Sequence, residues 1–117
     1  MKHLYGVYGV DIILDSETAE KLKSEYPIVE LDNIESSNNS MGSRIYSTSW
    51  YIPEHYKEHK KFLRAYYCGE WKGAIFFAKD LAANGPVDLR QYYKNMIARM
   101  EEGKPDNWDG TFRATSK

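Results

Sequence analysis

Apolar residues in the first part of the chain occur in short runs that predict strands on either side of one helix. Val10–Leu14 is an apolar run rich in β-branched residues, and it predicts a buried strand. Asp15 or Ser16 then offers an N-cap for a helix over Glu17–Glu25. Pro27 ends that helix, because a proline forces the residue before it out of the helical region.

A pair of strands follows, separated by a small polar segment. Ile28–Ile34 carries enough apolar residues to predict a strand, and Arg44–Trp50 alternates with a period of two. Glu35–Ser43 between them is polar and rich in small residues, which is typical of a hairpin loop. We therefore expect the two strands to pair in antiparallel fashion, which makes the order of elements βαββ.

From Pro53 onward the apolar positions recur with the period of a helix. Glu54–Cys68 and Trp71–Ala83 are predicted as two helices, and Gly69 breaks the chain between them. Asn84-Gly85-Pro86 ends the second helix, and we expect its Asn or Gly to adopt the left-handed conformation that is common after helices.

The third helix has the clearest amphipathic pattern in the chain. It begins at Asp88-Leu89-Arg90-Gln91, which resembles a capping box, and it ends at Gly103. Its apolar side recurs at intervals of three and four residues, at Leu89, Tyr92, Tyr93, Met96, Ile97 and Met100. The short polar tail that follows is expected to be anchored by Trp108 and Phe112.

These patterns predict an α+β fold in two parts. Residues 1–52 form the βαββ segment, and residues 53–117 form a tail of three helices that packs against it. The first two helices contain one spacing that is typical of a tetratricopeptide hairpin, at Tyr66, Gly69, Trp71, Ala74 and Phe77. About three such units are needed to bury a continuous core, so we do not expect a repeat array.

Composition excludes several classes of protein. The chain has 117 residues with 16 basic and 17 acidic side chains, and its net charge of −1 offers no strongly basic face for nucleic acid. Aromatic residues make up 15% of the chain, whereas disordered segments have few. No apolar run approaches the roughly 20 residues that span a bilayer, and the N-terminus lacks the apolar core of a signal peptide. With a single cysteine, Cys68, a cytoplasmic protein is expected.

Two sets of residues could carry chemistry on their own. His55-Tyr56-Lys57-Glu58-His59 matches the inverted zinc-protease motif, in which His55 and His59 would hold Zn²⁺ and the glutamate would act as base. The lysines around the motif are more typical of a solvated helix face, which we take as the simpler interpretation. Cys68 could act as a nucleophile beside a base, but we expect a buried structural cysteine.

Two ordered sets of residues extend over nearly the whole chain. The first runs from Tyr8-Gly9 through Ser16-Glu17-Thr18 and Glu30-Leu31-Asp32 to Arg44-Ile45-Tyr46. The second comprises Tyr66, Gly69, Trp71, Ala74, Phe77, Asn84-Gly85-Pro86, Tyr93, Arg99, Trp108-Asp109-Gly110 and Lys117. In this order they resemble the closing segment of a class III adenylate or guanylate cyclase catalytic domain and the helical extension that follows it in many bacterial cyclases.

The resemblance implies, for the intact family, conversion of a nucleoside triphosphate to a 3′,5′-cyclic nucleotide and pyrophosphate with two Mg²⁺ or Mn²⁺ ions. The family's metal-binding aspartates, base-selecting residues and transition-state residues precede its Tyr-Gly, so that here they would lie before residue 1. Its triphosphate-clamping lysine turn falls on Ser37, Asn38 and Asn39, where no lysine is present. We therefore expect no catalytic residue, substrate-binding residue or cofactor in this chain, and no activity of the chain alone.

Two hypotheses of function follow. In the first, the chain is the C-terminal segment of an adenylate cyclase-like enzyme in cyclic AMP signalling. The open edge of its incomplete sheet would then be covered by the helical tail, or would pair with an upstream cyclase half or a second copy of the chain. In the second, the helical hairpin is a non-enzymatic module that docks a protein partner through Tyr66, Trp71 and Tyr93. Neither hypothesis involves nucleic acid or a membrane.

Overall fold

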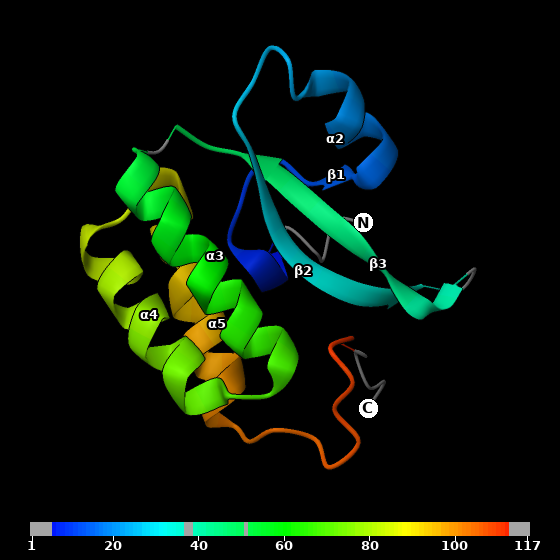
Figure 1. Cartoon of the computed structure of the whole chain (residues 1–117), viewed down its shortest axis with the longest axis vertical. Coiled ribbons are helices and arrows are strands. Elements are labelled where there is room, and N and C mark those ends of the chain that lie inside the picture. Colours follow the sequence, from blue (N-terminus) through cyan, green and yellow to red (C-terminus); the bar gives the residue numbers. More distant parts are fainter. Residues whose placement is uncertain (1–5, 37–38, 51, 113–117) are drawn as a thin grey trace.

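The βαββ order and the helices after it are both present in the computed structural model, which describes residues 6–36, 39–50 and 52–112 (Figure 1). The elements are β1 (Leu14–Asp15), α2 (Ser16–Leu22), β2 (Ile28–Ser36), β3 (Asn39–Thr48), α3 (Pro53–Cys68), α4 (Trp71–Asn84), the short 3₁₀ helix η1 (Val87–Leu89) and α5 (Arg90–Glu101). The fold is therefore α+β, as predicted. Among the described residues, no helix has the length and apolar character needed to cross a lipid bilayer.

The three strands form one antiparallel sheet in the order β1-β3-β2. β2 and β3 are the predicted hairpin, in a register that sets Val29 opposite Ser47. The strand predicted over Val10–Leu14 is shorter than expected, because β1 pairs with β3 over two residues only. Val10 and Ile13 are nevertheless buried, so their apolar character reflects the core rather than a strand.

α2 begins where the sequence predicts and ends earlier. The Asp15 side chain accepts a hydrogen bond from the Thr18 amide at 2.8 Å, which is the geometry of an N-cap. The helix stops at Leu22, and the amides of Glu25 and Tyr26 both donate to the Leu22 carbonyl. A closed turn therefore replaces the last part of the predicted helix.

Two glycines end helices for different reasons. Gly69 after α3 has a φ of 86°, the left-handed region, and its amide donates to the Tyr66 carbonyl. The left-handed residue predicted after α4 is wrong, because Asn84 is helical and Gly85 has a φ of −84°. Gly85 is needed for space instead, since a Cβ there would lie 2.6 Å from the Leu81 carbonyl oxygen.

α5 starts without the predicted capping box. The chain enters it through η1, in which the Leu89 amide donates to the Pro86 carbonyl. Asp88 lies exposed within that turn, and no side chain caps the first amides of α5. The turn before the helix thus takes the place of the expected side-chain cap.

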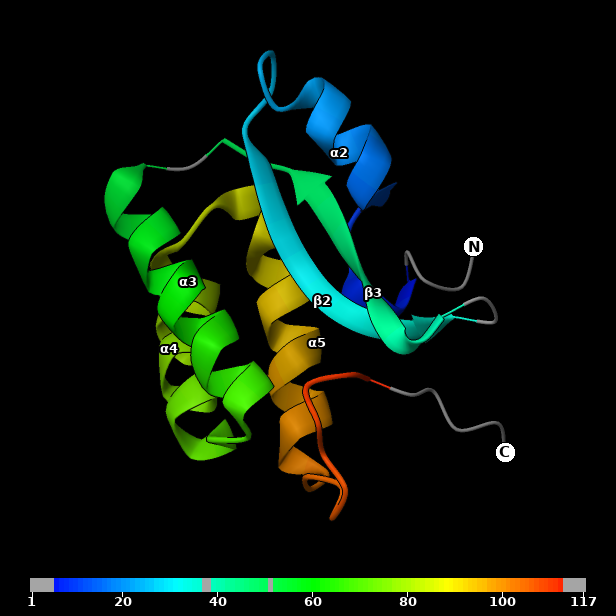
Figure 2. The ribbon, with the colours of Figure 1, turned by 45° about the vertical axis from the view of Figure 1, so that its right-hand side comes forward.

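The helices after residue 52 share one core with the hairpin of strands. α4 packs against both α3 and α5, while α2 lies against β1 and β3 on the other side of the sheet (Figures 1 and 2). One core joins residues from before and after the predicted boundary at residue 52, and its largest fully buried side chains include Tyr8, Leu31, Phe62, Tyr66, Leu81, Tyr92, Tyr93 and Met96.

The outer edge of β2, which an incomplete sheet would leave open, is covered in this chain. His59 Nε2 of α3 donates to the Glu30 carbonyl at 2.7 Å, and the Tyr92 hydroxyl of α5 donates to the Leu31 carbonyl at 2.5 Å. Further along the same edge, Phe112 of the tail forms an isolated parallel bridge with the strand. Of the ways to protect a strand edge, coverage by a helix and by the tail is the one found here.

Alanine substitutions at two glycines of the helical hairpin should have opposite effects. Gly69→Ala places a Cβ on a left-handed residue, 3.2 Å from Lys104 Nζ, and is expected to lower the free energy of unfolding by about 1–2 kcal/mol. Gly73 is exposed in α4, and no atom lies within 4 Å of a Cβ placed there. Gly73→Ala is therefore expected to raise the free energy of unfolding by about 0.5 kcal/mol. Urea unfolding measures both changes, and effects of the same sign would contradict the left-handed role of Gly69.

Candidate functional site

A fully buried carboxylate lies where the sheet meets the helices. Asp32 of β2 accepts hydrogen bonds from the Tyr8 hydroxyl at 2.6 Å, from Arg99 Nη1 at 2.6 Å and from the Asn33 amide at 2.7 Å. Arg99 comes from the last turns of α5, and its Nη1 also donates to the Tyr66 hydroxyl at 2.8 Å. The cluster therefore connects the N-terminal segment, the sheet, α3 and α5.

A β-bulge in β2 turns Asp32 toward the helices. Glu30 pairs with Tyr46 and Asp32 pairs with Ile45, so that Leu31 is the extra residue between them. Regular alternation would place Leu31 and Asp32 on opposite faces of the sheet, yet both are fully buried. The irregular pairing is thus what brings a charged side chain into the core.

The charges of Asp32 and Arg99 depend on each other. Burial raises the pKa of Asp32 above its ordinary value, and the guanidinium of Arg99 is the strongest of the effects that oppose this. Burial alone would lower the pKa of Arg99, but the charge of Asp32 together with the Tyr66 and Tyr8 hydroxyls outweighs it and the pKa is raised. Three donors converge on the carboxylate, and an ionised carboxylate is an acceptor only. We therefore assign an ionised Asp32 and a cationic Arg99.

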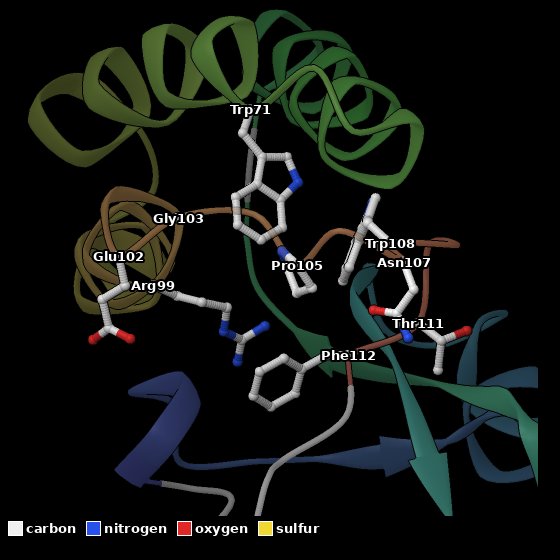
Figure 3. A pocket seen from close by; sticks show the side chains of 9 residues that line it. All are labelled: Trp71, Arg99, Glu102, Gly103, Pro105, Asn107, Trp108, Thr111 and Phe112. Carbon is white, nitrogen blue, oxygen red and sulfur yellow. The ribbon is translucent and has the colours of Figure 1, made fainter.

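A pocket of about 320 Å³ adjoins this cluster (Figure 3). Its walls are apolar, formed by Trp71, Pro105, Trp108 and Phe112. The guanidinium of Arg99 projects into it and stacks on the Phe112 ring, with Cζ 3.6 Å from the ring centroid. The remaining lining residues are Glu102, Gly103, Asn107 and Thr111.

Both indoles of the pocket are held by the C-terminal turn of α3. Trp71 Nε1 donates to the Tyr66 carbonyl at 2.9 Å, and Trp108 Nε1 lies 3.1 Å from the carbonyls of Tyr66 and Tyr67. Carbonyls in the last turn of a helix lack the amides of a further regular turn, so they can accept from side chains as well as from the capping Gly69 amide. The two rings meet edge to face at 5.1 Å between centroids, which fixes the pocket wall in place.

The residues expected to dock a protein partner lie in the core instead. Tyr66, Trp71 and Tyr93 are 0%, 7% and 0% exposed. The apolar sides of their helices face one another and the sheet. Burial of these sides holds the helices on strands β2 and β3. Tyr66 and Tyr93 have no exposed surface for a protein partner in the folded chain, and the exposed 7% of Trp71 is too little for an anchor residue, so the docking hypothesis loses its three anchor residues.

His59, a candidate zinc ligand, is buried rather than on a solvated helix face. Its Nε2 lies 2.7 Å from the Glu30 carbonyl, which only accepts, so this nitrogen carries the proton. Its Nδ1 accepts from the Tyr93 hydroxyl at 2.7 Å. Burial lowers the pKa of His59 to about 4 and keeps the ring neutral. Both ring nitrogens therefore have partners in the chain, and no lone pair is left for a metal.

The other residues of the zinc motif take part in different contacts. Burial and a hydrogen bond with Asp80 of α4 raise the pKa of Glu58 to about 7. His55 Nδ1 is buried and has no hydrogen-bond partner among the described residues. Among the residues that the structure describes, no three His, Cys, Asp or Glu side chains form a group that could hold a metal ion. The described part of the chain thus does not assemble the zinc site.

Two further expectations concern a cysteine and a turn. Cys68 is exposed at the end of α3, so the expectation of a buried cysteine is wrong; the buried side of that helix carries Phe62 and Tyr66 instead. The expected triphosphate turn falls on Ser37 and Asn38, which lie outside the described residues, and on Asn39, the first residue of β3.

Sequence reasoning missed the pair of Asp32 and Arg99 as a site. A signal was present, because Asp32 directly follows the apolar residues of a predicted strand. Arg99 lies three residues after Met96, on the apolar stripe of the third helix. Charged residues are almost never fully buried unless paired, so one acidic and one basic residue on two apolar faces indicate such a pair.

Comparison of the chain with models of protein families, with curated proteins and with solved structures finds no match. Its function therefore has to be argued from the sequence and from the geometry of this site.

Replacing Arg99 should destabilise the chain far more than replacing an exposed arginine. Arg99→Met leaves Asp32 buried without its cation, so the free energy of unfolding is expected to fall by about 3–5 kcal/mol. Arg44→Met is the matched control, because Arg44 forms an exposed pair with Glu30 at 3.0 Å, and a loss of about 0–1 kcal/mol is expected. Urea unfolding at neutral pH measures both, and equal losses would speak against a central role of the buried pair.

The neutral state of His59 predicts a pH dependence. Its pKa is about 4 in the folded chain and about 6.5 when unfolded, so the stability it contributes is present above pH 6.5 and is lost as the pH falls toward 4. His59→Gln does not titrate. The difference in unfolding free energy between the wild type and this variant should decrease by up to about 1.4 kcal/mol per pH unit in that window. A constant difference from pH 7 to pH 4 would show that His59 is not held neutral.

Proposed function

We propose that this chain is the C-terminal segment of a class III nucleotide cyclase, made of the closing strands of a catalytic domain and the helical extension after them. The observation that carries the proposal is the ion pair between Asp32 and Arg99, at 2.6 Å. Asp32 ends the Glu30-Leu31-Asp32 motif of the first resembling set, and Arg99 belongs to the second. Direct contact between them supports the interpretation that both sets belong to one folded unit.

Other residues of the second set also support this interpretation through their places in the packing. Gly69 provides the left-handed residue between α3 and α4, and Gly85 provides the space that Leu81 needs. Trp108 bonds to the end of α3, and Tyr93 donates to the buried histidine of the same helix. The motif is therefore accounted for by the requirements of packing the extension on the hairpin of strands.

In this proposal the chain supplies structure to the reaction rather than its chemistry. The two Mg²⁺ or Mn²⁺ ions of the family stabilise the charge of the reacting phosphates when bound. The buried carboxylate does not fit such a centre, because Asp32 is enclosed by Tyr8, Arg99 and the Asn33 amide. We therefore assign no step of the reaction to these residues, and the hairpin and its extension complete a domain whose other part binds the metals.

The chain alone is expected to form no cyclic AMP from ATP and no cyclic GMP from GTP, with either Mg²⁺ or Mn²⁺. The measurement is chromatographic separation of the products after long incubation at high protein concentration. A cyclic product that increases with protein concentration would overturn the structural role proposed here.

A pair of chimeras tests the positive part of the proposal. The catalytic domain of an active class III cyclase is cut before its Tyr-Gly and joined to this chain at Tyr8. One chimera keeps the natural turn, and the other carries Asn38→Lys to restore a cation for the triphosphate. The lysine chimera is expected to form cyclic AMP at least tenfold faster than the truncated domain, and the natural chimera more slowly than the lysine chimera. If both chimeras fold and neither exceeds the truncated domain, the proposal is wrong.

A further inference from the structure

Arg99 has more hydrogen-bond donors than its described partners use, and it lines a pocket. A guanidinium has five N–H donors. Among residues 6–36, 39–50 and 52–112, Arg99 Nη1 donates to Asp32 and to the Tyr66 hydroxyl, and the Tyr8 hydroxyl is a further hydrogen-bonding partner of the guanidinium. The side chain is 13% exposed, and Figure 3 shows its guanidinium directed into the pocket. Three partners leave donors of the guanidinium available to a ligand in this pocket.

The aromatic walls of the pocket offer flat apolar surfaces, and their indole N–H groups do not compete with Arg99 as donors. Trp71 and Trp108 have their indole N–H groups engaged by carbonyls of α3, so they present ring carbons to the pocket. Pro105 and Phe112 complete the apolar lining. At about 320 Å³, the pocket is at the small end of the range of roughly 300 to 1,000 Å³ that is usual for ligand sites.

The charge balance sets the class of ligand. Asp32 already neutralises Arg99, so the site has little excess positive charge for a multiply charged anion such as a phosphate ester. A single carboxylate matches the planar fork of a guanidinium through charge-assisted hydrogen bonds. Glu102 on the lining opposes the anion and moderates its affinity.

We propose that this pocket binds a small organic monocarboxylate with a flat apolar body, whose carboxylate pairs with Arg99 and whose body packs on Trp71, Trp108 and Phe112. The inference goes beyond the cyclase proposal and does not depend on it. It gives the helical extension a ligand-binding site at the point where the tail, α4 and α5 meet, next to the ion pair that joins them to the sheet.

Titration of the full chain with benzoate tests the proposal, with benzamide as the neutral compound of the same shape. The indole N–H signals in a ¹H–¹⁵N spectrum report on the site, because Trp71 and Trp108 line the pocket and Trp50, 78% exposed, does not. We expect benzoate to shift the first two signals saturably and to leave that of Trp50 in place. Benzamide is expected to bind at least tenfold more weakly. Absence of a saturable shift, or equal affinity for the two compounds, would overturn the proposal.

Two matched glutamate variants locate the site without disturbing the core. Glu102→Gln removes a negative charge from the pocket lining and is expected to tighten benzoate binding about threefold at low ionic strength. Glu101→Gln is the control, because Glu101 is exposed on the same helix and does not line the pocket. Neither variant should change the affinity for benzamide. Equal effects of the two variants on benzoate would place the ligand elsewhere and overturn the assignment.

Discussion

The buried pair of Asp32 and Arg99 is the interaction on which the rest of the structure depends. A carboxylate that is 0% exposed is tolerated only with a cation and further donors around it, so α5 must lie where its arginine reaches β2. The bulge at Leu31 is the matching requirement in the sheet, because it aims the carboxylate at the helix. Helix position and strand irregularity are therefore two consequences of one constraint.

The same pair also determines where the tail lies. Phe112 stacks on the guanidinium of Arg99 and, through its backbone, bridges to β2 beside Ile34. Trp108 completes the connection by donating to carbonyls at the end of α3. Because the tail is held at both points, it covers the strand edge and closes the pocket against Trp71. The same position of the tail thus protects the edge of β2, forms the pocket and contacts the buried ion pair.

Sequence patterns predicted the helices and strands well where contacts between neighbours in sequence determine the structure. The periodicity of residues 54–68, the alternation after Arg44 and the cap at Asp15 depend on neighbours in sequence, and the structure confirms each of them. The predicted capping box at Asp88 and the left-handed residue after α4 are wrong, because the approach of Gly85 to its helix and the η1 turn set the local geometry there.

The candidate site is harder to predict than the elements, because its contacts join residues that are distant in sequence. Asp32 and Arg99 are 67 positions apart, and only the bulge brings the carboxylate into reach. His59 was misread for the same reason: its neighbours in sequence are charged, while its partners lie on β2 and α5. A sequence pattern predicts which face of an element is apolar and which charged residues lie on it, but not the strand register and helix position that bring two such residues into contact.

The central claim is that the sheet and the helices form one cooperative unit through the buried pair. Native-state hydrogen exchange tests it directly, by comparing the free energies of opening for amides in the middle of β3 and of α4. The claim predicts that the most protected amides of both elements open with the same free energy, equal to that of global unfolding. If α4 stayed protected by several kcal/mol after β3 had opened, the helices would be stable without the sheet and the claim would be wrong.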